Sequence, residues 1–223
     1  MLRVRRDGLR STLRAIWAAM RPETLEIYRL ERLVAPQPAT GLEMRAGVEA
    51  LRRLREGCSL LPDEFYCEDR PGFAQCFCAV LDGLLVGIIW VLKGPNASRY
   101  IALREGEAEL AFLHVREAMR GRGIAKHLYW RAAAHCLSND ARAVYAVIAT
   151  GNAPSRKAAQ AIGFRKIAEI RRTALWGAKF RTESLPAPEQ MGPLETGSGA
   201  VGHGSRSGDH EIERHGVRGG GGL

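Results

Sequence analysis

Six residues near the middle of the chain, Arg120-Gly121-Arg122-Gly123-Ile124-Ala125, have the composition of a turn that binds an anion. They follow an apolar run of strand length, residues 108–115, and precede residues 126–137, where apolar side chains recur at helical spacing. A helix that starts at such a turn directs unpaired backbone N–H groups and the positive end of its dipole at one point. The glycines let the backbone approach a ligand without a Cβ in the way. The segment therefore predicts a site for phosphate groups.

A second motif, about thirty residues after the turn, runs from Asn152-Ala153-Pro154-Ser155 to Gly163-Phe164. The turn itself reads Arg-x-x-Gly-x-Ala, which is not the dinucleotide-binding G-x-G-x-x-G, and no Gly-Lys-Ser/Thr follows, so it is not a P-loop either. Together the two motifs resemble those of the GNAT superfamily of acetyl-CoA-dependent N-acetyltransferases. The hairpin Val80–Trp90, with its Asp-Gly turn, is similar to the second and third strands of that family.

This resemblance covers roughly residues 40 to 183 and implies an α/β (α+β) fold. The expected architecture is a mixed, mostly antiparallel central sheet of about six or seven strands flanked by helices. The sheet is expected to splay between the strands near 107–115 and 143–149. In the family, the pantetheine arm of acetyl-CoA enters this gap.

The resemblance also implies which residues hold acetyl-CoA. The backbone N–H of Val115, or of a neighbour, would polarise the thioester carbonyl. Asn152 belongs to the cofactor motif, although Asn152 and Gly163-Phe164 suit helix entry and core packing better than a role in the chemistry. The pyrophosphate would lie against backbone N–H groups of the turn. The Arg120 and Lys126 side chains would either bind the phosphates as well or be ordinary solvated charges. The residues of this cradle would be Arg120, Gly121, Arg122, Gly123, Ile124, Ala125 and Lys126.

Glu109 is the candidate general base. The run 108–115 is similar to a strand of the histone-acetyltransferase branch, in which a Glu at this place deprotonates the incoming amine. A carboxyl group on such an apolar strand would be partly desolvated, which would raise its pKa toward the range useful for a base. Alternatively, Glu109 is structural and neutralised by an arginine such as Arg104. Glu107 and His114 are the reserve candidates, and strand alternation puts His114 out of phase with Glu109.

One position departs from the pattern of the family. Many members carry a Tyr that protonates the departing thiolate, and this chain has Ala159 there. Tyr145, Tyr129 or water would then supply the proton, or the thiolate would leave unaided. Because a thiol of pKa ~8.5 is a fair leaving group near neutral pH, loss of the acid need not abolish activity.

The composition narrows the class of protein further. The 223 residues fit one domain with a core and terminal tails, and no apolar run approaches the ~20 residues of a membrane span. Five cysteines without a C-x-x-C pair predict reduced core thiols, no metal site and a cytoplasmic protein. The net charge of +9 could suggest nucleic acid. However, six arginines crowd the first 21 residues and no RNA-binding motif is present, so no nucleic-acid partner is expected.

The chain is expected to have three parts. Residues 1–38 form a basic N-terminal helix (7–20) and a linker, residues 39–183 form the acetyltransferase domain, and residues 184–223 form a disordered tail rich in Gly, Ser and Pro. Within the domain, the patterns predict strands over 41–46, 73–80, 84–93, 107–115, 143–149, 164–172 and 174–182, and helices over 48–56, 123–138 and 154–162.

The expected function is transfer of an acetyl group from acetyl-CoA, without a metal, to a primary amine of a small molecule or a protein. The acidic stretch 63–69 favours a cationic amine, because the family often shapes its acceptor pocket there. The alternative is a catalytically weak acetyl-CoA-binding or interaction module. It would dock weakly on a protein or a membrane surface through the arginine-rich residues 1–21. The sequence leaves open whether the protein forms a homodimer.

Overall fold

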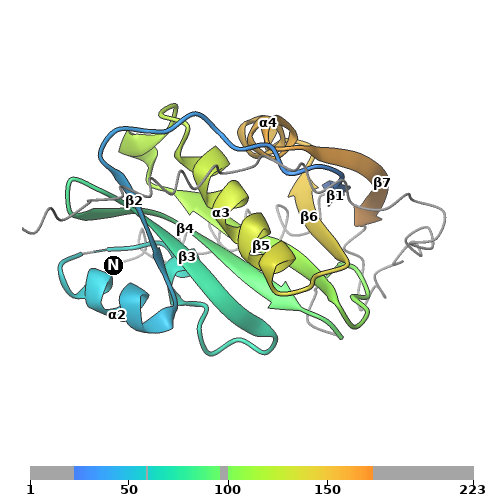
Figure 1. Ribbon diagram of the computed structural model, residues 1–223, viewed down its shortest axis with the longest axis horizontal. Helices are drawn as coiled ribbons and strands as arrows, with labels where there is room; N and C mark the ends of the chain where they lie inside the picture. Colours follow the sequence, from blue (N-terminus) through green and yellow to red (C-terminus); the bar gives the residue numbers. More distant parts are fainter. Residues whose placement is uncertain (1–22, 59, 96–99, 173–223) are drawn as a thin grey trace, which may run out of the picture.

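The computed structural model describes residues 23–58, 60–95 and 100–172, which form a seven-stranded sheet with helices on both faces (Figure 1). In chain order the elements are β1 (Glu23–Leu30), β2 (Leu42–Ala46), α2 (Val48–Glu56), the 3-10 helix η1 (Asp63–Tyr66), β3 (Phe73–Leu81), β4 (Leu84–Lys93), β5 (Glu107–Val115), the 3-10 helix η2 (Glu117–Met119), α3 (Ile124–Ser138), β6 (Ala143–Ala149), α4 (Ala153–Ala161) and β7 (Phe164–Arg172).

The strands lie in the order β2-β3-β4-β5-β6-β1-β7. Strands β5 and β6 are parallel, and every other neighbouring pair is antiparallel. The predicted mixed, mostly antiparallel sheet is therefore confirmed. A tight hairpin connects β3 and β4, α2 and η1 lie between β2 and β3, and the parallel pair β5 and β6 needs a crossover, which α3 supplies.

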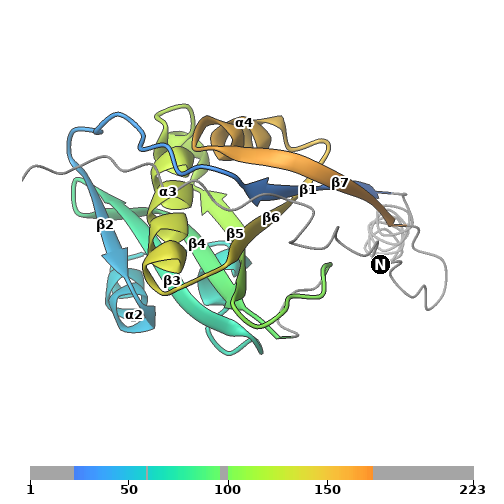
Figure 2. The ribbon, with the colours of Figure 1, turned by 45° about the vertical axis from the view of Figure 1, so that its right-hand side comes forward.

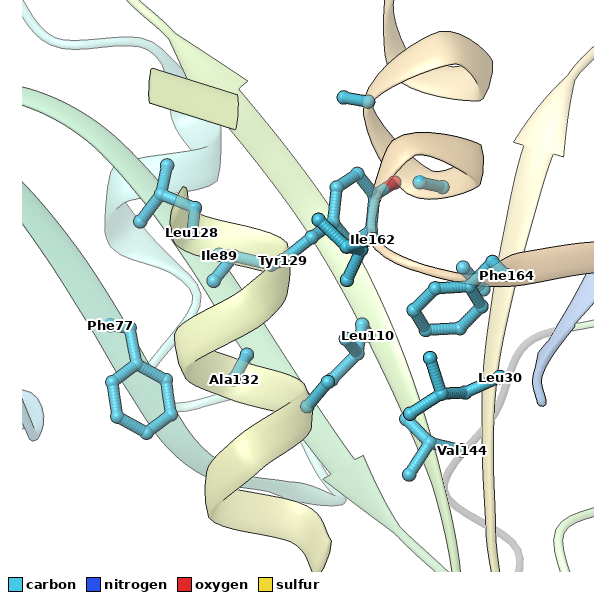
Figure 3. Packing of buried hydrophobic residues seen from close by; sticks show 14 of the residues in the cluster. Leu30, Phe77, Ile89, Leu110, Leu128, Tyr129, Ala132, Val144, Ile162 and Phe164 are labelled. Carbon is cyan, nitrogen blue, oxygen red and sulfur yellow. The ribbon is translucent and has the colours of Figure 1, made fainter. Parts of the chain in front are cut away.

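Each face of the sheet has its own apolar core, and Figure 2 shows α3 lying across one of the two faces. On one side, here called the α3 face, α3 and α4 pack on the sheet; Leu128, Tyr129 and Ala132 of α3 lie over Ile89 and Leu110 (Figure 3). On the other side, here called the α2 face, Leu51 of α2 and Phe65 of η1 lie in a core with Trp90 and Tyr145. Because both faces are covered, the central strands are apolar almost throughout, as the sequence pattern predicts.

Helix α3 approaches the sheet most closely at Gly87 of β4. A Cβ built at Gly87 would lie 3.0 Å from both the carbonyl oxygen of His114 and Cδ1 of Leu128, and 3.5 Å from Cγ2 of Ile124. Gly87 also pairs with Val115, the last residue of β5. The glycine thus allows the first turns of α3 to pack directly beside the end of β5.

Strand β1 corrects the sequence analysis, which expected the first strand at 41–46 and treated residues 1–38 as a helix and linker. Residues 23–30 instead form a strand between β6 and β7. Two buried charged residues, Glu26 and Arg29, interrupt its apolar pattern and hide it from a periodicity argument. Glu26 Oε2 accepts a hydrogen bond from the Tyr28 hydroxyl (2.6 Å), and Arg156 and Lys166 neutralise its charge at 3.3 and 3.1 Å.

Three other predictions, the helix over 7–20, the strand over 174–182 and the tail over 184–223, lie outside the described residues. In the described part of the chain, no helix is both long and apolar enough to cross a membrane. The five cysteines, all of them within the described residues, are free thiols; four are buried and Cys58 is partly buried.

Candidate active site

The sheet divides between its two parallel strands. Strands β5 and β6 pair at three positions, the last of them Glu109 opposite Tyr145. Beyond this point β5 stays paired with β4 as far as Val115, and β6 stays paired with β1 as far as Ala149. The two halves of the sheet therefore diverge toward the carboxyl ends of β5 and β6 (Figure 1). The predicted splay is confirmed.

A β-bulge in β5 lies within the diverging part. The register steps from Ile88 opposite His114 to Trp90 opposite Ala111, so β5 carries one more residue than β4. The bulge contains Phe112, whose φ of 51° lies in the left-handed region that L-residues rarely adopt.

The bulge brings Glu109 and His114 to the same face. Glu109 lies opposite Leu92 and Tyr145, which belong to the α2-face core. Beyond the bulge, His114 also faces that side, because its ring contacts Phe65 with centroids 5.6 Å apart. The expectation that Glu109 and His114 are out of phase is therefore wrong, since strict alternation does not hold across a bulge.

The backbone of Val115 is directed into the gap. Arg116 donates its N–H to the carbonyl oxygen of Val86 (2.9 Å), so these two residues form a hydrogen-bonded pair across β4 and β5. In an antiparallel ladder such pairs alternate with non-hydrogen-bonded pairs, and Val115 opposite Gly87 is the next pair. The N–H and carbonyl groups of Val115 therefore point away from β4, toward the side where β6 diverges.

The glycine-rich turn leads from this strand end into α3. Gly121 and Gly123 have φ angles of 80° and 77°, and α3 begins at Ile124. Among the residues that the structure describes, none accepts a backbone hydrogen bond from the N–H groups of Gly121, Arg122 or Gly123. The first N–H groups of α3, including that of Ala125, have no partner within the helix. The turn thus presents a row of backbone donors.

The charged side chains of the turn behave differently from one another. Lys126 folds back over the turn, because a Cβ built at Gly123 would lie 3.3 Å from its Cε and 3.8 Å from its Nζ. Arg120 instead donates from Nε to the carbonyl oxygen of Val115 at 3.2 Å, which joins the turn to the end of β5. Arg122 is exposed. Of these three charged side chains, Lys126 is therefore the one that lies over Gly123, beside the row of backbone donors.

The second sequence motif has a structural role. Asn152 is the N-cap of α4, and its Oδ1 accepts a hydrogen bond from the backbone N–H of Ser155 at 3.2 Å. Gly163 has a φ of 101°, and a Cβ there would lie 1.7 Å from the carbonyl oxygen of Arg32. Phe164 is buried against Tyr129 (Figure 3). These contacts supply the helix start and core packing that the sequence analysis gave as one alternative.

Neither tyrosine named as a substitute acid lies at the open end of the gap. Ala159 and Tyr129 are buried on the α3 face, and the Tyr129 hydroxyl lies 2.9 Å from Ser155 Oγ. Tyr145 is fully buried at the last paired position and donates to Glu107 Oε1 at 3.4 Å. Burial raises the pKa of each tyrosine to about 12.

The two strand carboxylates differ in their surroundings. Both carboxylate oxygens of Glu107 accept hydrogen bonds: Oε2 from the backbone N–H of Arg104 at 2.8 Å, and Oε1 from the Tyr145 hydroxyl. It closes the loop before β5. Glu109 is only 3% exposed and lies where β5 and β6 cease to pair. Of the two, Glu109 is the carboxylate at the origin of the gap.

Glu64 is the residue that the sequence analysis did not single out. Its Oε2 lies 3.4 Å from Nδ1 of His114, and its carbonyl oxygen accepts the indole N–H of Trp90 at 2.7 Å. The acidic stretch 63–69 signalled an acceptor site, but spacing alone could not show which acid reaches β5. In the structure, Glu64 contacts His114 and Glu68 instead forms a partly buried ion pair with Arg55.

Comparisons with known proteins agree with this arrangement. The chain matches the Acetyltransferase (GNAT) family over residues 44–164, more than half of its length. No curated protein sequence matches it. Several solved structures are similar in fold. One is described as an acetyltransferase of the GNAT family from Novosphingobium aromaticivorans, with a TM-score of 0.50 and 18% identity, over 68% of this chain and 63% of that one.

A second structure is a GCN5-related N-acetyltransferase from Sphaerobacter thermophilus, with a TM-score of 0.49 and 17% identity, over 76% of this chain and 58% of that one. A third is an aminoglycoside N-acetyltransferase in complex with CoA, with a TM-score of 0.44 and 19% identity, over 66% of this chain and 99% of that one. This chain thus covers less than two thirds of the first two of these structures. The family match extends from β2 to the start of β7 and includes the turn, the divided strands and α4. The family predicted from the sequence is confirmed: the chain belongs to the acetyltransferase (GNAT) family.

Proposed function

We propose that the chain is an acetyl-CoA-dependent N-acetyltransferase that acts on a primary amine. The observation that carries this proposal is the divided sheet beside a turn with unused backbone donors. An extended pantetheine arm can form backbone hydrogen bonds along the diverging part of β5. The turn and the first residues of α3 suit the pyrophosphate, because donors and helix dipole act at the same place. Lys126 adds a positive charge there.

The thioester carbonyl would be polarised from the strand end. The N–H of Val115 points into the gap. We propose the N–H of Leu113, two residues earlier, as the alternative donor. A backbone donor aimed at the developing oxyanion commonly contributes about 2.7–4 kcal/mol to the stability of the transition state. Leu113 is the neighbour that brings the carbonyl closer to Glu109.

Glu109 is proposed as the general base that deprotonates the acceptor. From Glu109 to Leu113 the strand advances roughly 10 Å, because the bulge at Phe112 adds little length. A glutamate side chain and one water molecule can bridge such a distance. The acceptor would therefore approach from the α2 face, where both Glu109 and His114 lie. The carboxylate of Glu64 on that face supports a cationic amine as the acceptor.

A second candidate function is an acetyl-CoA-binding module without useful turnover. Ala159 motivates it, because this position is buried and offers no hydroxyl to the leaving thiolate. The arginine-rich residues 1–21 would then dock the module on a partner. Such a protein would bind acetyl-CoA but release no CoA thiol in the presence of amines.

The proposal is tested by measuring release of the CoA thiol from acetyl-CoA with a panel of amines. The panel should contain polyamines, amino sugars, aminoglycosides and peptides with free amino groups, beside calorimetry of acetyl-CoA binding. Saturable, amine-dependent thiol release supports the transferase. Binding without thiol release for every class of amine would favour the module, and absence of binding would contradict both.

A further inference from the structure

We propose that His114, oriented by Glu64, carries a proton from the acceptor nitrogen to the leaving sulfur of CoA. This inference rests on the proposed acetyl transfer and adds a second proton-carrying residue to it. His114 would be a catalytic residue, and Glu64 would be a positioning residue that acts through it.

Proton balance requires the acceptor nitrogen to lose two protons when the substrate is an ammonium ion. The nitrogen of R–NH₃⁺ loses one proton before it attacks the thioester, and Glu109 takes that proton and passes it to water. After the N–C bond forms, the positively charged nitrogen of the tetrahedral intermediate loses a second proton. As the C–S bond breaks, the sulfur gains one proton to become the CoA thiol. A single imidazole can accept the second proton and deliver it to sulfur, which returns the imidazole to its neutral state.

The bulge gives His114 the necessary position. Because Phe112 adds one residue to β5, His114 faces the same side as Glu109. It also directly precedes Val115, whose N–H points into the gap. An acetyl group bound at that end of the gap therefore has an imidazole beside it on the face from which the amine approaches.

Within residues 23–58, 60–95 and 100–172, the polar contact to the His114 ring is at Nδ1. Nδ1 lies 3.4 Å from Glu64 Oε2, and the edge of the ring packs against Phe65. A carboxylate 3.4 Å from Nδ1 favours a proton on that nitrogen, and Nε2 of the neutral ring then presents a lone pair. The side chain remains 19% exposed, so the ring can be reached by a substrate. When Nε2 accepts a proton, the adjacent carboxylate stabilises the imidazolium.

Glu64 suits this positioning role better than the other carboxylates that form ion pairs at buried or partly buried positions. Glu26 is neutralised by Arg156 and Lys166, and Glu68 by Arg55. Glu64 instead pairs with an imidazole, which carries a positive charge only when it is protonated. Other charged groups on this side of the sheet include Glu109 of β5, Arg116, which donates to the carbonyl oxygen of Leu85 at 3.3 Å, and Arg70, whose guanidinium lies over the Phe112 ring at 5.1 Å.

The two tyrosines are poorer proton donors for the sulfur. Tyr129 is bound to Ser155 and Tyr145 to Glu107, both in the interior. Burial raises the pKa of each to about 12, so each holds its proton much more tightly than a thiol of pKa ~8.5. A histidine returns its proton readily in this range, because its ordinary pKa is about 6.5.

The geometric part is tested on the protein without substrate, by long-range ¹H–¹⁵N NMR of the His114 ring above its titration. The expected result is a neutral ring protonated at Nδ1, a preference that Glu64→Ala removes. A wild-type ring protonated at Nε2 would overturn the proposal. This measurement does not depend on transferase activity, so its outcome can be separated from that of the amine panel.

The chemical part is tested with acetyl-CoA and the amine that the panel selects. His114→Gln should lower kcat by about 10²–10⁴ and leave the KM for acetyl-CoA unchanged. Glu64→Gln should lower kcat by a smaller factor, about 10- to 100-fold. Free imidazole should restore part of the activity of His114→Ala. Melting curves of each variant check that it folds.

His135→Gln is the matched control, because His135 also packs edge-on against a phenylalanine, Phe77, but lies near the far end of α3. It should keep wild-type kcat. Full kcat in His114→Gln, or a loss confined to the KM for the amine, would overturn the proposal and leave acetyl transfer by Glu109 standing.

Discussion

One residue, Phe112, decides which side chains can act together in this protein. Its left-handed φ marks the bulge that turns His114 to the face of Glu109. The sequence identifies both candidates by type and spacing, but it gives no sign of the bulge, because nothing in a Phe among apolar residues signals a positive φ. The sequence therefore predicts the members of the candidate site and not their relative orientation.

At the residue scale, the first prediction concerns Glu109→Gln. If Glu109 is the base, the amide keeps the shape of the side chain but cannot take a proton, so turnover should fall by about 10²–10⁴. The loss should shrink at high pH, where the amine arrives already neutral. Acetyl-CoA affinity should hardly change, since the carboxyl group lies away from the phosphate turn. A rate-against-pH profile for both proteins is the measurement.

Glu107→Gln is the matched control for that variant, because Glu107 lies two residues away and is engaged by Arg104 and Tyr145. Its effect should appear as a lower melting temperature. An equal loss of turnover at every pH in Glu109→Gln would identify Glu109 as structural or as an acceptor-binding residue.

The second prediction concerns Gly123→Val in the turn. A side chain at φ 77° is strained, and its Cβ would meet Cε of Lys126 at 3.3 Å and obstruct the row of backbone donors. Acetyl-CoA binding should weaken at least tenfold, or ~1.4 kcal/mol, as measured by calorimetry on the folded protein. Affinity equal to wild type would remove the turn from the binding site.

At the scale of elements, most of the fold could be read from the sequence. The helix at 48–56 and the strands at 84–93 and 107–115 have the predicted bounds, because hydrophobic periodicity and turn residues agree there. Strand β1 was missed for a physical reason. Its buried Glu26 is stabilised by Arg156 and Lys166, which lie more than 100 positions away in the chain. Local patterns do not contain such long-range neutralisation.

The third prediction tests how the chain crosses from β1 toward β2. The carbonyl oxygen of Arg32 lies 1.7 Å from the position of a Cβ at Gly163, and Gly163 has a φ of 101°. Gly163→Ala should therefore destabilise the protein by about 2–5 kcal/mol, from left-handed strain and overpacking together. Chemical denaturation measures this. Gly57→Ala is the control, since a Cβ there meets nothing within 4 Å and its φ is −92°; an equal loss there would contradict the explanation.

At the scale of the whole molecule, a carboxylate on each side of the sheet ties distant elements together; Glu26 is buried and Glu68 is partly buried. On the α3 face, Glu26 of β1 binds Arg156 of α4 and Lys166 of β7. On the α2 face, Glu68 pairs with Arg55 of α2, which also donates to the carbonyl oxygen of Phe65. The hydrogen bond from Tyr28, with Lys166 and Arg156, lowers the pKa of Glu26 despite its burial. Although burial acts to raise the pKa of Glu68, the hydrogen bond and charge of Arg55 lower it overall.

The last prediction follows from the sign of these two shifts. A carboxyl group whose pKa is lower in the folded state binds fewer protons there than in the unfolded chain. Its contribution to stability is therefore complete above the unfolded value of about 4.5 and is lost as the pH falls through the lowered folded value. The free energy of unfolding should accordingly fall on acidification below about pH 4.5.

Glu26→Gln should lower stability at pH 7 by about 1–3 kcal/mol, the order of a hydrogen bond to a charged group, and its stability should depend less on pH in the acid range. Urea denaturation from pH 7 to pH 3 checks this, with Glu43→Gln as the exposed control. Parallel curves for wild type and Glu26→Gln would show that Glu26 titrates alike in both states and that its ion pairs add nothing to the strand pairing and apolar packing that hold β7 and α4 in place.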